Sequence, residues 1–215
     1  MQIKKLYILT GLLTFQANTV LAEPFWYLKP TVGISQMGDK KGQTVDLGSV
    51  NGTAEIELDG GFTPGLSFGY NFGNQWATEF GWEYRSNDSQ TTLADGTFYP
   101  EGNYASNVFF LNGYYHFNTQ SKWQPYIGAG LMFSQEIDID LELDGVELSY
   151  TADGDTGFQI MGGVTYAINN DWSLNGEIRY GSFSGIDLTG EGNIGQINDL
   201  DYDPLTIGMG LQYNF

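Results

Sequence analysis

The sequence lacks cysteine altogether, which excludes disulfide bridges, zinc sites built on thiolates and cysteine nucleophiles. Basic residues are also scarce: eight lysines and arginines stand against 26 aspartates and glutamates, for a formal net charge of −18. A chain this acidic offers no basic surface to phosphates, so we expect no nucleic-acid partner. Proline is rare, with six residues, whereas glycine (30 residues) and aromatic side chains (15%) are abundant. This composition is typical of a β-rich chain rather than a disordered one.

The N-terminus has the pattern of a secretory signal peptide. A basic start is followed by an apolar run over residues 6–15, and small or apolar side chains precede a cleavage site after Ala22. A run of roughly ten apolar residues is too short to cross about 30 Å of hydrocarbon as a helix. We therefore expect residues 1–22 to be removed on export and residues 23–215 to form one domain.

One unit recurs along the rest of the chain. A segment ends on an aromatic-rich triplet, turns over a few polar residues, and the next segment begins on a tryptophan. The triplets are Tyr70-Asn71-Phe72, Tyr115-His116-Phe117, Tyr166-Ala167-Ile168 and, at the end of the sequence, Tyr213-Asn214-Phe215. Such a repeat predicts β-hairpins joined by short turns.

Eight strands and four long loops follow from this repeat. The predicted strands are 25–36, 62–72, 76–86, 105–117, 124–135, 156–168, 172–183 and 204–215. The long loops, rich in Gly, Asp, Asn, Ser and Thr, are 37–60, 87–104, 136–155 and 184–203. Short turns that alternate with long loops are typical of outer-membrane barrels, and an even number of strands places both termini on the periplasmic side.

The strands separate an apolar face from a face of small and polar residues. In the last predicted strand, Leu205, Ile207 and Met209 share one face, and Gly208 and Gly210 lie on the other. This period-two alternation predicts β-structure. The glycine-rich face is too poor in charge for a normal water-facing surface, but it suits the narrow lumen of an eight-stranded barrel. The apolar face is therefore predicted to face lipid.

Large aromatic residues gather at the predicted short-turn end of the strands. They are Trp26, Trp76, Trp123, Trp172, Phe72, Phe117 and Phe215. Aromatic residues collected at one level are typical of the girdle that a barrel places at a membrane interface.

Two further motifs are the run Pro125-Tyr126-Ile127-Gly128-Ala129-Gly130 and the ending Gln212-Tyr213-Asn214-Phe215. With the signal peptide and the alternating strands, the chain resembles the small outer-membrane β-barrel families, namely the OmpA transmembrane domain, OmpX, OmpW and the opacity-type surface proteins. The resemblance covers essentially all of residues 23–215. It implies an all-β fold, an eight-stranded antiparallel up-and-down transmembrane β-barrel in the bacterial outer membrane. In these families a terminal aromatic such as Phe215 implies recognition by the barrel-assembly machinery.

Six charged residues fall on the predicted inner face: Lys29, Glu79, Glu83, Arg85, Glu177 and Arg179. Unpaired charges in a narrow lumen would be costly, so pairing is expected. Because the third and seventh strands lie roughly opposite each other, we expect Glu79 and Glu83 to reach Arg179. By the same argument Arg85 should reach Glu177. The favoured interpretation is a largely plugged interior. The alternative is a narrow porin-like channel or small-molecule conduit, with a gated ion path through these pairs.

Acidic residues crowd the third and fourth long loops. Those predicted to attract cations are Asp138, Asp140, Glu142, Asp144, Asp199, Asp201 and Asp203. Their carboxylates suit Ca²⁺ or Mg²⁺, but the EF-hand loop pattern is absent, so no specific metal site is predicted. Divalent cations that bridge these loops to lipopolysaccharide are a hypothesis. Alternation over residues 136–144 also predicts that the fifth strand continues above the membrane and turns at Asp144-Gly145.

The predicted function is therefore structural: a barrel that presents four long acidic extracellular loops for envelope structure or for surface interaction and adhesion. The expected partners are outer-membrane lipid, lipopolysaccharide, the barrel-assembly machinery and a host surface or extracellular ligand, and no cofactor is expected. A lipid-modifying enzyme would need an activated nucleophile or a paired base. The single histidine, His116, falls at the predicted lumen mouth without a nearby His-x-Ser arrangement. No enzyme activity is predicted.

Overall fold

The computed structural model describes residues 23–47, 50–117, 119, 121–192 and 194–215. The predicted signal peptide lies outside the described residues. Within them the chain forms twelve strands, all paired antiparallel. These are β1 (Phe25–Gln36), β2 (Lys40–Leu47), β3 (Val50–Asn71), β4 (Trp76–Thr92), β5 (Phe98–Tyr99), β6 (Glu101–His116), β7 (Trp123–Leu143), β8 (Val146–Ala152), β9 (Thr156–Ala167), β10 (Trp172–Gly190), β11 (Gln196–Tyr202) and β12 (Leu205–Asn214). Over this part of the chain, no helix has the length and apolar character needed to span a membrane.

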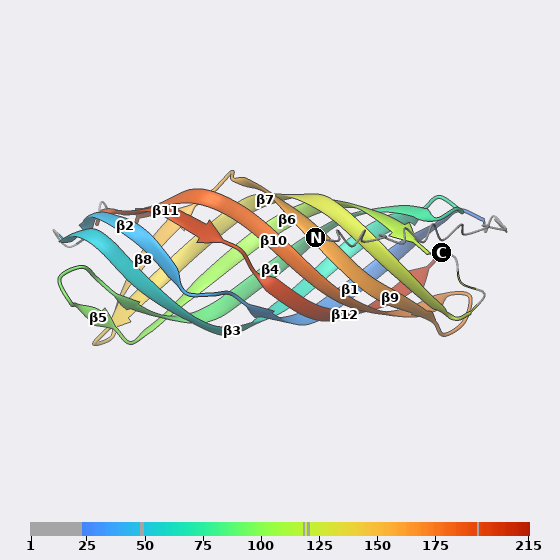
Figure 1. Cartoon of the computed structure of the whole chain (residues 1–215), viewed down its shortest axis with the longest axis horizontal. Helices are drawn as coiled ribbons and strands as arrows, with labels where there is room; N and C mark the ends of the chain where they lie inside the picture. The colour runs from blue at the N-terminus through green and yellow to red at the C-terminus, as the bar shows by residue number, and fades with distance from the viewer. Residues whose placement is uncertain (1–22, 48–49, 118, 120, 193) are drawn as a thin grey trace, which may run out of the picture.

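Eight of the strands close into a ring. Each pairs with the next along the chain in the order β1, β3, β4, β6, β7, β9, β10, β12, and β12 pairs back onto β1. The result is the elongated, tilted barrel of Figure 1, with the short turns and the C-terminus at one end and the long hairpins at the other. The predicted fold class, an eight-stranded antiparallel up-and-down barrel, is confirmed.

The segments predicted as long loops are mostly strands, so that part of the prediction was wrong. β3, β4, β7 and β10 run well past their predicted ends, and β2, β8 and β11 add short strands beside them. These extensions pair into a second closed ring above the first, in the order β2, β3, β4, β6, β7, β8, β10, β11. The predicted hairpin at Asp144-Gly145 is confirmed, with both residues at positive φ (54° and 76°), as a type I′ turn requires.

Three β-bulges separate the two rings. Each places two consecutive residues on the outer side of the wall: Asp59-Gly60 in β3, Gln135-Glu136 in β7 and Ser184-Gly185 in β10. Because side chains alternate along a strand, a pair on the same side reverses which residues face inward from there on. We call the part of the barrel between the short turns and the bulges the lower half, and the part beyond the bulges the upper half.

The bulge in β7 reverses which face of the strand carries the apolar side chains. Below it Leu131 faces outward and is 55% exposed, whereas Gly130 lies on the inner face. Above it Ile137, Ile139 and Leu141 point inward and are almost fully buried. The lower half therefore has the apolar outer face and the small or polar lining that the sequence predicts. The upper half has an apolar interior and an acidic outer face.

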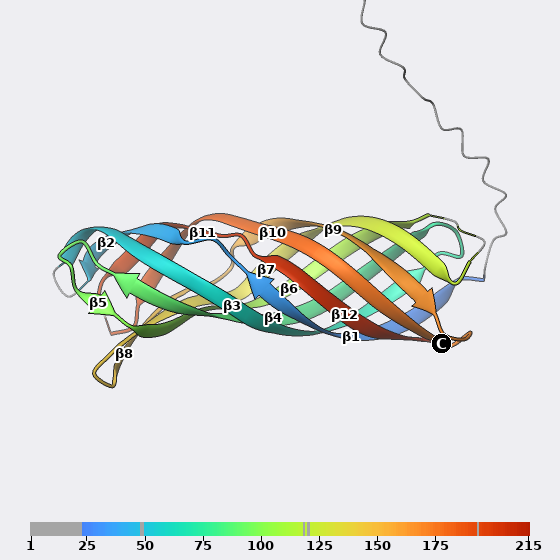
Figure 2. The same ribbon diagram turned by 60° about the horizontal axis from the view of Figure 1, so that its bottom comes forward.

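The β7–β8 hairpin is the least embedded part of the wall. β8 pairs with β7 along its whole length but meets β10 only at Tyr150 and Thr151. In Figure 2 this hairpin leans away from the body of the barrel. Its tip therefore lies outside the closed wall of the upper half.

Candidate functional site

The six predicted lumen charges all lie inside the lower half, where they form two groups. In the first, Lys29 Nζ lies 2.6 Å from Glu79 Oε2, and both residues are buried. Glu79 also accepts hydrogen bonds from the hydroxyls of Tyr27 (3.0 Å) and Tyr114 (3.2 Å). A buried carboxylate is thus surrounded by a cation and two donors, which is how a charge is kept in a narrow lumen.

A glycine makes room for this first group. Tyr27, Gly69 and Glu79 lie side by side on β1, β3 and β4. A Cβ atom on Gly69 would stand 2.1 Å from the ring of Tyr27. Because Gly69 has no side chain, the ring crosses over β3 and reaches the carboxylate on the next strand.

The second group is centred on Glu83. Its carboxylate forms ion pairs with Arg85 on the same strand and with Arg179 across the lumen. Arg179 Nε also lies 3.7 Å from Oε1 of Glu177, and the other carboxylate oxygen of Glu177, Oε2, accepts a hydrogen bond from the Tyr126 hydroxyl at 2.9 Å. The group is fully inside the wall and joins strands from opposite sides of the ring.

Two of the predicted pairings were wrong. Glu79 pairs with Lys29 instead of Arg179, because Lys29 Nζ is the cation that lies within 2.6 Å of the Glu79 carboxylate. Arg85 pairs with Glu83, two residues away on the same face of β4, and not with Glu177. Of the expected contacts across the lumen, the structure forms the one between Glu83 and Arg179.

The upper half closes over these charges with an apolar core that the sequence reasoning missed. Tyr202 joins the two layers: its hydroxyl lies 2.8 Å from Ser106 Oγ, and the Arg85 guanidinium lies 5.9 Å from its ring centre. Tyr104 packs edge-on against Tyr202 at 4.9 Å. The core residues are Met37, Leu47, Ala54, Ile56, Leu93, Tyr104, Val108, Phe110, Met132, Ile137, Ile139, Leu141, Tyr150, Phe183, Ile186, Leu188, Ile197, Leu200 and Tyr202. The alternation of apolar and acidic residues after position 136 was the available signal.

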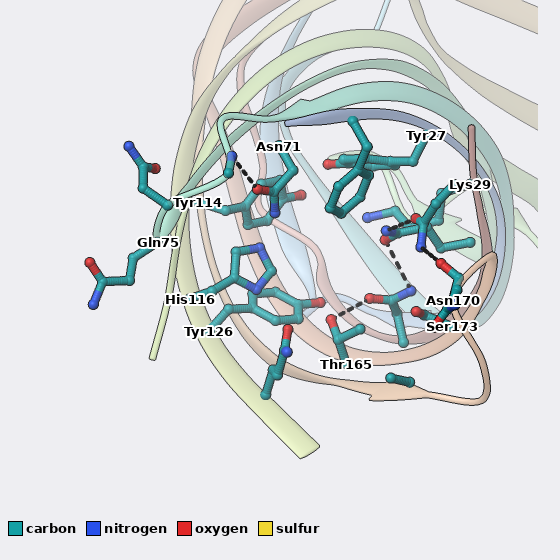
Figure 3. A pocket seen from close by; sticks show the side chains of 18 of the residues that line it. Tyr27, Lys29, Asn71, Gln75, Tyr114, His116, Tyr126, Thr165, Asn170 and Ser173 are labelled. Carbon is teal, nitrogen blue, oxygen red and sulfur yellow. Dashed lines mark hydrogen bonds between the residues drawn. The ribbon is translucent and has the colours of Figure 1, made fainter. Parts of the chain in front are cut away.

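A cavity of about 440 Å³ opens at the short-turn end of the barrel. We call it the vestibule. Its inner end is formed by Tyr27, Tyr114 and Tyr126 together with Lys29. His116 lies in its wall, as Figure 3 shows, and its Nδ1 atom is buried without a hydrogen-bond partner among the described residues. Beyond this inner end, Lys29 and Tyr126 also line a smaller cavity of about 20 Å³ that reaches Arg179.

The predicted aromatic girdle residues lie next to the short turns and all point outward. The exposed residues are Trp26, Trp76, Trp123, Trp172, Phe72, Phe117 and Phe215. Several pack against rings of the adjacent strand: Trp26 stacks on Phe68 at 4.9 Å, and Trp172 contacts Tyr213 in a tilted arrangement at 4.8 Å. Rings this large on an exposed surface, at one level, match the amphipathic zone of a bilayer.

The predicted cation-attracting residues are spread over the outside of the upper half. Asp138, Asp140 and Glu142 alternate along β7, Asp144 stands at the hairpin tip, and Asp199 and Asp201 lie on β11. Asp203 forms an ion pair with Lys40. Within the described residues, no three histidines, cysteines or carboxylates come together as a metal site. The structure thus presents these residues as an acidic surface.

Asp138 is expected to make the upper half sensitive to pH. Partial burial, and then the nearby carboxylates of Asp140 and Glu136, raise its pKa from 3.8 to about 6. The carboxyl group of Asp138 thus binds its proton more tightly in the folded state than in the unfolded state. Protonation therefore stabilises the folded state, and this contribution to the free energy of unfolding is complete below about pH 4 and is lost as the pH rises through about 6. We predict higher hydrogen-exchange protection factors for β7 and β8 at about pH 5 than at about pH 7.5. Asp138→Asn should flatten this difference, and an unchanged pH dependence in the variant would contradict the prediction.

Comparisons with known proteins agree with this architecture. Residues 7–215 match the family model described as outer membrane protein beta-barrel domain. Outer membrane protein AlkL from Ectopseudomonas oleovorans is 28% identical over 105 residues, which cover 47% of this chain and 43% of AlkL. The match thus spans less than half the length of that relative. OprG from Pseudomonas aeruginosa has a TM-score of 0.67 at 16% identity, over 90% of this chain and 97% of that one. Neisserial surface protein A has a TM-score of 0.53 at 19% identity, over 88% and 97%. At these identities the two structures show the fold alone.

Proposed function

Because the chain belongs to the outer membrane protein beta-barrel family, with its strands crossing the bacterial outer membrane, we propose that it is a closed barrel with a structural or surface-interaction role. It presents a rigid acidic surface outside the cell for envelope structure or adhesion. One observation supports the proposal: above the vestibule the interior holds charged and apolar side chains, and the cavity beside Lys29 and Arg179 has a volume of only about 20 Å³. Buried ion pairs occupy the lower half and an apolar core occupies the upper half. A hydrated ion would have to cross both layers.

In this proposal the short turns and both termini face the periplasm and the upper half stands outside the cell. The exposed apolar belt of the lower half supports a position in hydrocarbon, and the exposed tryptophans beside the short turns support one interface. The bulges then lie near the outer interface, since the outer face changes there from apolar to acidic. Phe215, exposed at the end of β12, is the residue we propose for recognition by the barrel-assembly machinery.

The acidic upper surface is the part we propose to meet partners. Carboxylates such as Asp140 and Glu142 follow the apolar belt along β7. In this proposal they meet the head groups of lipopolysaccharide. Divalent cations between these carboxylates and lipopolysaccharide would tie the barrel to its surroundings. The outermost hairpin, around Asp144 and Gly145, is the segment best placed to contact a host surface or extracellular ligand.

We further propose that the protein is not an enzyme. His116 is the one histidine of the chain, and its Nδ1 atom has no carboxylate partner within the described residues. The ion pairs of the lumen lie inside the wall of strands, which separates them from lipid in the surrounding bilayer.

The closed interior is tested by electrical recording. We predict that the purified protein, inserted into planar bilayers, produces no resolvable single-channel steps, because the apolar core removes water from the path. Removal of the two core rings in the double variant Tyr104→Ala/Tyr202→Ala should leave a cavity above the charges and allow conductance. Discrete steps from the unmodified protein would instead support a narrow channel.

A further inference from the structure

The vestibule has a lining unlike the rest of the barrel interior. Asparagine and glutamine are its commonest residues, joined by threonine, serine, tyrosine and histidine. Among the described residues that line it there is no carboxylate, and Lys29 is the one lysine or arginine. That lysine already forms an ion pair with Glu79 at the inner end of the vestibule. The cavity is therefore polar without offering a free charge.

This charge balance selects the class of ligand. An anion would need a free cation, and an amino acid or peptide terminus would need partners of both signs. A neutral molecule rich in hydroxyl groups needs neither, because amides and hydroxyls donate and accept hydrogen bonds at the same site. Planar amides can also bind two neighbouring hydroxyls at once.

Two opposite walls of the vestibule have complementary chemistry. On the side of β6 and β7, the rings of His116 and Tyr126 lie 5.3 Å apart, and Tyr114 packs edge-on against Tyr126 at 5.4 Å. Figure 3 shows these rings on one side of the cavity, with Ser173 and Asn170 on the other. Aromatic rings offer flat apolar faces to the C–H side of a ligand ring. His116 Nδ1 is a buried polar atom with no hydrogen-bond partner in the part of the chain that the structure describes.

The polar wall is organised before any ligand arrives. Asn175 Oδ1 accepts a hydrogen bond from Thr165 at 2.7 Å, and the Asn175 amide lies 3.5 Å from Gln212. Gln212 in turn donates to Asn214 at 2.7 Å. These contacts fix the amide orientations and lower the entropy lost on binding. The volume of about 440 Å³ lies in the range of small-molecule sites.

We propose that the vestibule binds a neutral saccharide of one or two rings, which enters from the short-turn end. The amides of β10 and β12 hold its hydroxyl groups, and the rings of His116 and Tyr126 cover one face of the sugar. Such a ligand has two sources, a free disaccharide or the end of a cell-wall glycan. Both share the chemistry that the vestibule recognises.

The test is isothermal titration of the refolded protein in a detergent without a sugar head group, since an alkyl maltoside would itself compete. The probes are maltose, for a free disaccharide, and N,N′-diacetylchitobiose, for a glycan end. We expect saturable binding of at least one probe, with affinity lowered about tenfold in Asn175→Leu and in His116→Phe. Gln90→Leu, an exposed amide on the upper half of β4, is the matched control and should bind normally.

Each outcome decides the proposal. Binding of either probe with loss in both vestibule variants supports it and names the source. Absence of binding to both probes overturns it, as does binding that either folded vestibule variant leaves unchanged. A band shift between unboiled and boiled samples verifies that each variant has folded as a barrel. Since His116→Phe keeps the ring and alters no hydrogen bond seen in the structure, the test holds even if Asn175→Leu does not fold.

Discussion

Deletion of Asp138 is expected to open the upper half of the barrel, whereas deletion of Gln135, three residues earlier, should be tolerated. Gln135 is the extra residue of the β7 bulge: Ser134 pairs with Val108 and Glu136 with Asn107, so Gln135 has no partner on β6. Without it the ladder becomes regular, and Ile137, Ile139 and Leu141 keep their inward direction.

Loss of Asp138 cannot be absorbed in this way. Either Ile139 and Leu141 turn outward and Asp140 turns inward, or the bulge is lost and Glu136 enters the core in place of Ile137. Both arrangements put a carboxylate among residues that are almost fully buried. An ion in such a place costs several kcal/mol, and each large apolar side chain that leaves loses about 1.5–3 kcal/mol.

Limited proteolysis of the protein in lipid vesicles, read by mass spectrometry, separates the two deletions. We expect cleavage within residues 136–152 for the Asp138 deletion and protection like that of the unmodified protein for the Gln135 deletion. The lower half should stay intact in both, with a normal band shift on unboiled gels. Equal protection of the two variants would show that the inward direction of β7 does not hold the upper half together.

Glu83→Ala should be the most destabilising single change to the lumen. It removes the carboxylate shared by Arg85 and Arg179. Arg179 then keeps only the more distant carboxylate of Glu177, and Arg85 keeps a hydrogen bond to the hydroxyl of Thr206 but no carboxylate. Breaking a buried ion pair from one side costs about 3–5 kcal/mol, because the remaining charge is uncompensated. Urea unfolding in lipid vesicles should show this loss in the free energy of unfolding.

An exposed ion pair on the same protein is the control for this measurement. Lys41 and Glu55 lie 2.6 Å apart on the outer face, with side chains 68% and 63% exposed. Glu55→Ala should therefore cost about 1 kcal/mol or less. The double variant Glu83→Ala/Arg85→Ala should recover part of the stability lost in Glu83→Ala. If Glu83→Ala and Glu55→Ala unfold at the same urea concentration, the central position of Glu83 in the lumen is wrong.

The sequence was sufficient for the lower half because its signals are regular. Alternation along strands such as β12 predicts the outward direction of Leu205, Ile207 and Met209, all of which are exposed. The same alternation places Glu83 and Arg179 inside. These predictions depend on a period of two, which a bilayer enforces along every strand that crosses it.

The upper half was mostly missed because its decisive features are local. A bulge is one extra residue, and pairs such as Ser184-Gly185 look like ordinary loop sequence. The polar partners inside the lumen were also beyond reach, since the Lys29–Glu79–Tyr27 contact depends on the space left by Gly69 on the strand between. Which charged and polar side chains pair inside the lumen depends on residues of three neighbouring strands. The spacing of residues along a single strand does not reveal such an arrangement.

Five strands run without a break through both rings: β3, β4, β6, β7 and β10. The hairpins of the upper half are consequently not separate loops that can be replaced one at a time. Exchanging one hairpin for that of another barrel also exchanges a strand that lines the apolar core, so the whole upper half would have to be transplanted to preserve its shape. Chimaeras cut at the level of the bulges, with all five continuous strands moved together, are therefore the natural units for surface display on this barrel.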